Sequence, residues 1–202
     1  MNEFTVRMAV PEDAESLLAI YAPYIRETCI TFEYEVPSVR EFRSRMEEVL
    51  KSYPWLVCEQ DGGPAAYAYA HRYMTRAAYQ WDAELSVYTD RNRTGQGIGR
   101  ALYTALMEIL KLQNVKNVYG IVTSPNPPSE ALHYAMGFSL MGVSRKTGFK
   151  QGHWIDVSWF ERSIASLAEA PGPLLKMSEA DQEKIRAILL SAQRQLNGRT
   201  GK

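Results

Sequence analysis

The chain has 202 residues, 46% of them hydrophobic and 23% charged, so it is long enough for one domain with a continuous core and is unlike a disordered protein. Its 23 Lys and Arg residues balance its 23 Asp and Glu residues, which excludes an overall positive field for nucleic acid or an anionic membrane surface. The N-terminus lacks a signal-peptide pattern, and no later run approaches the roughly 18 apolar residues of a membrane span. We expect a cytoplasmic protein that binds neither nucleic acid nor membranes.

The two cysteines, Cys29 and Cys58, do not have the spacing of metal ligands and lack a partner histidine motif. They are predicted to be buried thiols in a reducing compartment, and no metal site is expected.

The first third of the chain predicts a strand and two helices. Apolar residues alternate over residues 4–8, and Pro11 then opens a helix, since proline is well tolerated in a first helical turn. Ser38, with Glu41 three residues later, predicts the N-cap of a second helix, which ends before Pro54.

The middle of the chain predicts antiparallel strands followed by a long helix. Residues 55–60 and 65–70 flank Asp61-Gly62-Gly63, a turn sequence that predicts a hairpin. Residues 82–89 form a third strand of the same region. A strong apolar stripe from Ile98 to Leu110 then predicts the best-defined helix of the chain.

The following segments complete one domain. Residues 118–122 are a short buried strand, a helix starts at Ser129 and stops at Gly137, and two strands follow at 138–149 and 154–160. This order of elements predicts an α+β domain with a mixed, mostly antiparallel sheet flanked by helices.

A separate tail follows a short Pro/Gly linker at residues 169–173. The segment Ser178-Glu179-Ala180-Asp181 is predicted to cap an extra C-terminal helix whose apolar side carries Ile185, Ile188, Leu189, Ala192 and Leu196. We expect a domain at residues 1–165 and an appended segment at 166–202. The apolar side of the helix must cover either the domain's own surface or a partner subunit.

A glycine loop lies between the strand at 82–89 and the long helix. Gly95, Gly97 and Gly99 let the backbone approach a phosphate closely, and the helix dipole at Ile98 favours an anion. No Gly-Lys-Ser/Thr follows, so the loop is not a P-loop, and a dinucleotide fold would need it near the start of a parallel sheet. A phosphate-bearing ligand is expected, with a plain strand-to-helix turn as the alternative.

This loop resembles the pyrophosphate loop of the GNAT superfamily, which reads Arg/Gln-x-x-Gly-x-Gly/Ala after the fourth strand. Gly97-Ile98-Gly99 fits that pattern, whereas Thr94 stands where Arg or Gln is usual. The substitution removes a side-chain donor but leaves the backbone amides. Arg93 and Arg100 are near enough in sequence to compensate.

The resemblance extends over residues 3–162 and is more specific than the superfamily. Ordered segments look like the phosphinothricin and methionine-sulfone acetyltransferases: YIRET (24–28), TFE (31–33), RAAYQW (76–81), ELSVY (84–88), PN (125–126), HYAMGF (133–138) and GFKQGHWIDV (148–157). The resemblance implies a homodimer that uses acetyl-CoA as cosubstrate. It would acetylate a small amine such as phosphinothricin, methionine sulfone or methionine sulfoximine by direct attack in a ternary complex. Ile155 stands where several members have His, so no role is carried over to it.

Two side chains are candidates for acid–base chemistry. A regular strand at 82–89 puts Glu84, Ser86 and Tyr88 on one face, and Glu84 matches a family glutamate that the resemblance makes the general base. His133 lies four residues before Gly137, where the resemblance places the group that protonates the CoA sulfur. The alternatives are an outward charge on a strand and a structural histidine on a helix.

The resemblance also assigns contacts with acetyl-CoA. Val87 and Thr89 would pair with pantetheine through their main chains, and Asn126 would contact the cofactor unless it is only a turn residue between prolines. The full expected set is Val87, Tyr88, Thr89, Gly95, Gln96, Gly97, Ile98, Gly99, Arg100 and Asn126.

For the acceptor, Arg72 and Arg76 could hold a carboxylate, and Phe32, Tyr73 and Tyr79 could line a pocket for a compact side chain. Two other hypotheses stay open. One is acetylation of peptide N-termini or polyamines, and the other is a non-catalytic acyl-CoA-sensing module whose tail helix contacts a partner.

Overall fold

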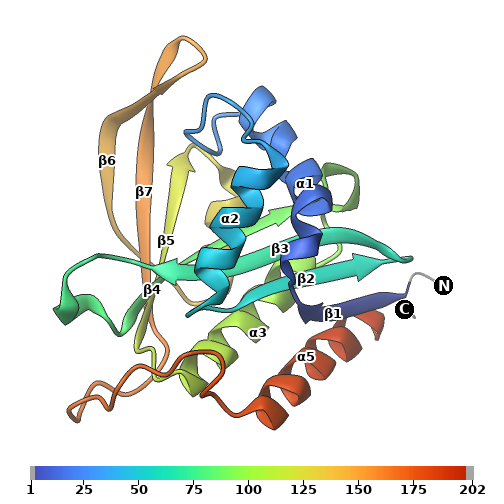
Figure 1. Cartoon of the computed structure of the whole chain (residues 1–202). Coiled ribbons are helices and arrows are strands. Elements are labelled where there is room, and N and C mark those ends of the chain that lie inside the picture. The colour runs from blue at the N-terminus through green and yellow to red at the C-terminus, as the bar shows by residue number, and fades with distance from the viewer. Residues whose placement is uncertain (1–2, 199–202) are drawn as a thin grey trace.

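The fold is built on one seven-stranded sheet with the strand order β1-β2-β3-β4-β5-β7-β6 (Figure 1). The structure, a computed structural model, describes residues 3–198, so the first two residues and the last four of the predicted tail lie outside it. Among the described strands, only β4 and β5 pair in parallel. The expected α+β fold with a mostly antiparallel sheet is confirmed. The strands are β1 Phe4–Met8, β2 Trp55–Gln60, β3 Gly63–Arg72, β4 Asp82–Thr89, β5 Asn117–Ser124, β6 Ser139–Lys150 and β7 His153–Ser163.

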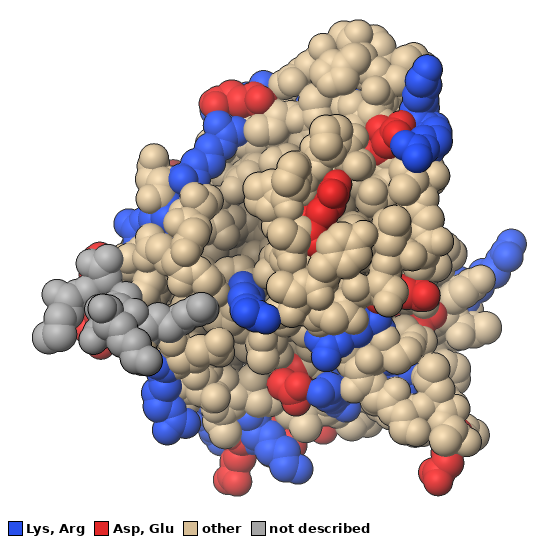
Figure 2. All heavy atoms as spheres, turned by 180° about the vertical axis from the view of Figure 1, so that it is seen from behind, with Lys and Arg blue, Asp and Glu red and all other residues tan. Residues whose placement is uncertain are grey.

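Helices cover both faces of the sheet (Figure 1). They are α1 Ala14–Glu27, α2 Val39–Leu50, α3 Ile98–Leu112, α4 Pro127–Ala135 and α5 Gln182–Asn197. The first two pack on one face, while α3 and α5 pack on the other. Within residues 3–198, no helix is long and apolar enough to cross a membrane. On the face seen in Figure 2, acidic and basic side chains are interspersed, as the balanced composition predicts.

Helix starts follow local capping chemistry. The capping box at Ser38 is confirmed, since its Oγ accepts from the Glu41 amide at 3.2 Å and the Glu41 carboxylate accepts from the Ser38 amide at 2.8 Å. One predicted start is wrong, since Asn126 caps α4, which begins at Pro127 rather than Ser129. The cap of α5 is Asp181, the last residue of the predicted capping segment, so the helix begins at Gln182.

The β2–β3 hairpin turns on Asp61 and Gly62, whose φ angles are 54° and 82°. Two successive left-handed residues form a tight hairpin turn, so β3 begins at Gly63, two residues earlier than predicted. Cys58 is buried, as expected, but the prediction for Cys29 is wrong, because this thiol is only half-buried.

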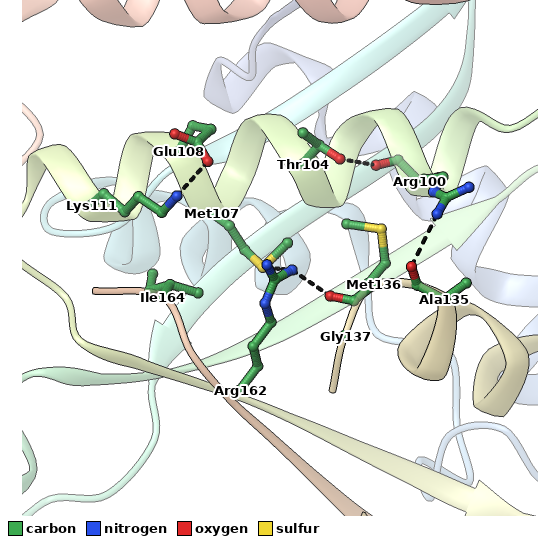
Figure 3. A pocket seen from close by; sticks show the side chains of 10 residues that line it. All are labelled: Arg100, Thr104, Met107, Glu108, Lys111, Ala135, Met136, Gly137, Arg162 and Ile164. Atoms are coloured by element: carbon green, nitrogen blue, oxygen red, sulfur yellow. Dashed lines mark hydrogen bonds and ion pairs between the residues drawn. The ribbon is translucent and has the colours of Figure 1, made fainter. Parts of the chain in front are cut away.

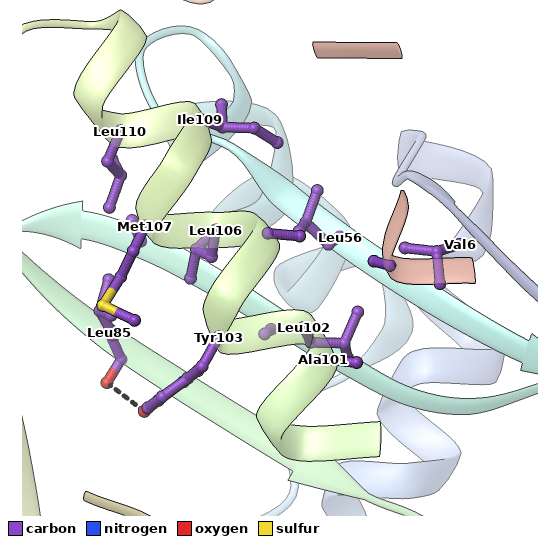
Figure 4. Packing of buried hydrophobic residues seen from close by; sticks show 14 of the residues in the cluster. Val6, Leu56, Leu85, Ala101, Leu102, Tyr103, Leu106, Met107, Ile109 and Leu110 are labelled. Atoms are coloured by element: carbon purple, nitrogen blue, oxygen red, sulfur yellow. Dashed lines mark hydrogen bonds between the residues drawn. The ribbon is translucent and has the colours of Figure 1, made fainter. Parts of the chain in front are cut away.

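The main core lies between the sheet and the apolar stripe of α3 (Figure 4). Leu102, Leu106 and Ile109 are fully buried there, and Leu56 of β2 packs beneath them. The hydroxyl of Tyr103 on the same helix donates to the Leu85 carbonyl of β4 at 3.2 Å. The start of α3 is thereby held directly over β4.

The C-terminal helix α5 belongs to this same core. It packs on α3 and β1, and Asn197 pairs with both backbone groups of Phe4, at 2.8 and 3.0 Å. Its apolar side therefore covers the domain's own surface. The linker is fixed as well, because Trp81 donates to the Gly172 carbonyl at 2.8 Å. The boundary near residue 165 stays a prediction.

The feature that positions the site is the divergence of β4 from β5. They pair only from Asp82 to Glu84 on β4 and from Asn117 to Tyr119 on β5. Beyond that point β4 stays paired with β3, and β5 stays paired with β7. The sheet consequently opens between β4 and β5, while each of them stays hydrogen-bonded to the neighbouring strand on its other side.

Candidate active site

The backbone of β4 faces the opening at alternate residues. The Asp90 amide donates to the Ala65 carbonyl of the adjoining segment at 2.8 Å, so the even-numbered residues of β4 face β3. Leu85, Val87 and Thr89 thus direct their amides and carbonyls toward the gap. Two of these carbonyls already accept hydrogen bonds. The Tyr103 hydroxyl donates to the Leu85 carbonyl, and the Tyr24 hydroxyl donates to the Thr89 carbonyl. Val87 is left to pair with an extended ligand.

A narrow cavity of about 60 Å³ lies in this opening. Side chains from the facing strands and from α3 and α4 enclose it: Leu85, Ser86, Val87, Tyr88, Tyr103, Ile121, Val122, Thr123, Asn126, Ser129 and His133, with Ile30 at its edge. Four of the predicted site residues, Val87, Tyr88, Asn126 and His133, meet here, two from β4 and two from α4 and its N-cap.

The glycine loop ends at the start of α3, close to this opening. Gly95 and Gly97 have φ angles of 77° and 82°, a left-handed conformation that favours glycine. Gly97 is the N-cap, and within the described part of the chain no side chain caps the first amides of α3. An uncapped helix start with free backbone amides suits an anion such as a pyrophosphate.

The neighbouring basic and polar side chains are already engaged. Arg93 donates to the Gln60 carbonyl at 2.8 Å, and the Gln96 amide oxygen accepts from the Gln60 side chain at 3.0 Å. Arg100 donates to the Ala135 carbonyl at 3.0 Å and lines a separate groove of about 410 Å³ between α3, the end of α4 and β7 (Figure 3). Both arginines therefore bind main-chain carbonyls, and compensation for Thr94 by either of them stays a prediction.

His133 is almost fully buried, with 2% of its surface exposed. A carbonyl oxygen can only accept, so Nδ1 carries the hydrogen that goes to Ser129 at 2.8 Å. Nε2 has no partner among the described residues, and it faces Gly120 of β5. Burial lowers the pKa of His133, so the neutral ring is favoured.

Glu84 approaches the opening from the other face of the sheet. Its neighbours Ala83 and Leu85 point into the α3 core, so Glu84 points toward the α1 and α2 side. It lies opposite His71 on β3 and Tyr119 on β5. Glu84 and His133 therefore lie on opposite faces of the sheet, with Glu84 at the last β4–β5 pair and outside the lining of the narrow cavity.

A larger cavity of about 450 Å³ adjoins the cleft, and Ile121 lines both. Tyr73, Met74, Thr75, Arg76, Tyr79 and Trp159 complete its wall. Three of the predicted acceptor residues, Tyr73, Arg76 and Tyr79, meet in this wall. Arg72 and Phe32 do not line it, and Phe32 instead packs on Gly148 of β6.

Sequence reasoning missed His71, Tyr103 and Trp159. Only His71 left a signal in the sequence, since it continues the alternation of Tyr67 and Tyr69. The register of the β3–β4 pair places it opposite Glu84. The site offers a neutral imidazole in the cleft, a carboxylate where β4 and β5 diverge, an uncapped helix start, and a cavity with one guanidinium.

A family model described as an acetyltransferase (GNAT) domain matches residues 6–159. The chain belongs to the GNAT acetyltransferase family. It is an N-acetyltransferase with acetyl-CoA as its cosubstrate, in agreement with the free Val87 edge and the uncapped start of α3.

Relatives of this acetyltransferase are similar over most of their length. This chain is 34% identical over 168 residues to a phosphinothricin N-acetyltransferase of Streptomyces viridochromogenes. The match covers 83% of this chain and 90% of that protein. This chain is 25% identical over 161 residues to an L-methionine sulfoximine/L-methionine sulfone acetyltransferase of Salmonella typhimurium, covering 79% and 94%. A phosphinothricin acetyltransferase from Sinorhizobium meliloti, solved in complex with acetyl-CoA, superposes with a TM-score of 0.81 at 32% identity, covering 84% and 93%.

Proposed function

We propose that this enzyme acetylates the amine of a small amino-acid-like acceptor of the phosphinothricin, methionine sulfone or methionine sulfoximine type. The observation that carries the proposal is the cavity of about 450 Å³ that meets the cleft at Ile121. Its guanidinium, on Arg76, suits the carboxylate of an amino acid, and Tyr73, Tyr79 and Trp159 suit a compact side chain. The names of the relatives support the same acceptor class.

Glu84 is the proposed general base. It lies opposite Tyr119, two residues before Ile121 on the same strand, so an amine held in the cavity is near its carboxylate. Glu84 removes one proton from the acceptor ammonium, and the free amine then attacks the thioester carbonyl. The carbon–nitrogen bond forms directly, in a complex that holds both substrates.

His133 is proposed to return a proton to the CoA sulfur. Attack leaves a second hydrogen on the nitrogen, and the lone pair at Nε2 of His133 can accept it. When the carbon–sulfur bond breaks, the imidazolium gives this proton to the thiolate and becomes neutral again. The lowered pKa of the buried ring favours that return.

Acetyl-CoA contacts are proposed for the edge of β4 and the start of α3. The Val87 main chain and the Thr89 amide would pair with pantetheine, while Gly95 to Gly99 would hold the pyrophosphate through their amides. Tyr88 packs its ring on Tyr21 and Tyr24 and pairs its main chain with β3, so it would contribute only as part of the wall of the cleft. Asn126, already the cap of α4, lines the same cleft.

A cytoplasmic homodimer is proposed as well. The two thiols, Cys29 and Cys58, are free. Exposed apolar side chains that could form an interface lie on the β6–β7 hairpin, among them Met141, Phe149 and Trp154.

The other hypotheses predict different sites. A polyamine acceptor would meet the like charge of Arg76 in the cavity wall, which opposes its binding. A non-catalytic sensor has no need for a carboxylate where β4 and β5 diverge and a buried imidazole in the cleft.

A thiol-release assay tests the proposal. Acetyl-CoA is supplied with phosphinothricin, methionine sulfone, methionine sulfoximine, a peptide N-terminus or a polyamine, and the wild type is compared with Glu84→Gln. The expected result is turnover of the amino-acid analogues only, with a loss of about a hundredfold or more in kcat for the variant. If no acceptor gives a rate above hydrolysis, the catalytic proposal fails. If the variant keeps full turnover, Glu84 is not the base.

A further inference from the structure

His71 faces the carboxylate of Glu84 across the β3–β4 pair. Its Nε2 lies 3.6 Å from Glu84 Oε1, and the two side chains are 33% and 19% exposed. Among the described residues, His71 carries the only basic group within ion-pair distance of Glu84. The pair therefore forms one polar unit at the wall of the opening.

The other nitrogen of the ring fixes where its proton lies. Nδ1 lies 3.1 Å from the Arg72 carbonyl, and since a carbonyl only accepts, Nδ1 carries a hydrogen. In the neutral ring, Nε2 then turns a lone pair toward the carboxylate. One further proton, held between Nε2 and Glu84, converts this repulsive contact into an attractive one.

The surroundings favour placing that proton on His71. Burial opposes a charge on the ring, but the contact with the negatively charged Glu84 outweighs it and raises the pKa of His71 above its ordinary value. The titratable and charged groups that interact with the pair are Tyr69 and Arg72 on β3, Tyr73 after it and Tyr103 on α3. Asp82 on β4, Tyr119 on β5 and Glu161 on β7 lie around Tyr73.

We propose that His71 acts through Glu84 as its proton acceptor. Glu84 takes a proton from the acceptor ammonium, whose N–H bond breaks, and passes it to Nε2 of His71, where a new N–H bond forms. The carboxylate is restored next to an imidazolium, and the partly exposed ring then releases the proton to water. His71 is a positioning residue, since it does not touch the substrate, and the inference rests on the proposed role of Glu84.

A titration of the three histidines by NMR tests the pairing without any substrate. His71→Gln identifies the signal of His71, and the titration is repeated in Glu84→Gln. The expected result is a His71 pKa above 6.5 in the wild type that falls in Glu84→Gln. A His71 pKa that is the same in both proteins overturns the proposal.

Kinetics test the proton transfer itself. His71→Gln keeps a polar side chain beside Glu84 but cannot accept a proton, and His153→Gln makes the same change in an exposed histidine at the start of β7. His71→Gln is expected to lower kcat by about tenfold or more while the KM for acetyl-CoA stays unchanged, and the control is expected to keep the wild-type kcat.

The pH profile separates this role from a structural one. In the wild type, His71 must be neutral to accept the proton, so kcat rises with pH through the raised pKa of the ring. In His71→Gln the acid limb moves to lower pH, because a carboxylate titrates below an imidazole. An unchanged kcat and an unchanged acid limb overturn the proposal. A wild type without turnover, or a fully active Glu84→Gln, would instead refute the proposed function.

Discussion

The ring of His133 lies so close to Gly120 that a Cβ atom at position 120 would come within 2.1 Å of Nε2. The ring is also stacked on Phe160 of β7, the cross-strand partner of Gly120, with centroids 5.0 Å apart. A glycine in the middle of β5 is therefore required by the position of the imidazole. We expect Gly120→Ala to displace the ring and to lower kcat by about tenfold or more, with a loss of about 1 to 3 kcal/mol of stability from overpacking.

The matched control is Gly142→Ala on β6, where an added Cβ would meet no atom within 4 Å. Thermal unfolding and kcat are measured for both variants. Normal kcat in a stably folded Gly120→Ala protein would show that the ring position does not matter.

The buried His133 also predicts a pH dependence of stability. Its pKa is lowered in the folded state, so below about pH 6.5 the unfolded chain binds more protons than the folded one. The free energy of unfolding therefore falls as the pH drops through this range. The difference between wild type and His133→Gln is followed by denaturant unfolding between pH 7.5 and 5.5. We expect the wild type to lose stability relative to the variant, and a pH-independent difference would contradict the assignment of a neutral ring.

Arg76 in the acceptor cavity is expected to govern acceptor affinity. Arg76→Gln removes a charged hydrogen bond to a carboxylate, so KM for the acceptor should rise about tenfold to a hundredfold while KM for acetyl-CoA stays constant. Arg145→Gln on the exposed side of β6 is the control. Equal effects on both KM values would place Arg76 outside the acceptor site.

Gly97 and Gly62 share a φ of 82°. Comparing an alanine variant at each position therefore separates the effect of backbone strain from an effect on cofactor binding. Alanine costs about 1 to 2 kcal/mol in this conformation, so both Gly97→Ala and Gly62→Ala should lower stability by similar amounts. Only Gly97→Ala should raise KM for acetyl-CoA, because its amide and the start of α3 form the proposed anion site. Steady-state kinetics with varied acetyl-CoA measure this KM. An equal rise in KM for Gly62→Ala would contradict a role of the glycine loop in binding acetyl-CoA.

Leu189 and Leu190 are adjacent on α5, but they are 9% and 55% exposed. Leu189→Ala should cost about 2 kcal/mol or more of unfolding free energy, while Leu190→Ala should change it by less than about 0.5 kcal/mol. Urea unfolding of both variants measures the difference. Similar values would mean that α5 does not share the core with α3 and β1.

The local signals of the sequence determined the elements and the cofactor loop. Period-two and helical patterns gave the strands and helices within a few residues, because alternation and the helical stripe depend on near neighbours. The capping box at Ser38 and the glycines before Ile98 are equally local. Where a competing cap lay a few residues away, as with Asn126 before Ser129, the predicted start was wrong.

Tertiary structure alone decided which of these residues meet. The divergence of β4 from β5, the approach of His133 to Gly120, and the contact of α5 with β1 join segments far apart in the chain. The same holds for Trp159, which reaches the acceptor cavity from β7, and for Phe32, which the fold turns away to Gly148. Side-chain periodicity fixes the face on which a residue lies, but strand order and divergence arise from the packing of whole layers, and these set the distance between Glu84, His71 and His133.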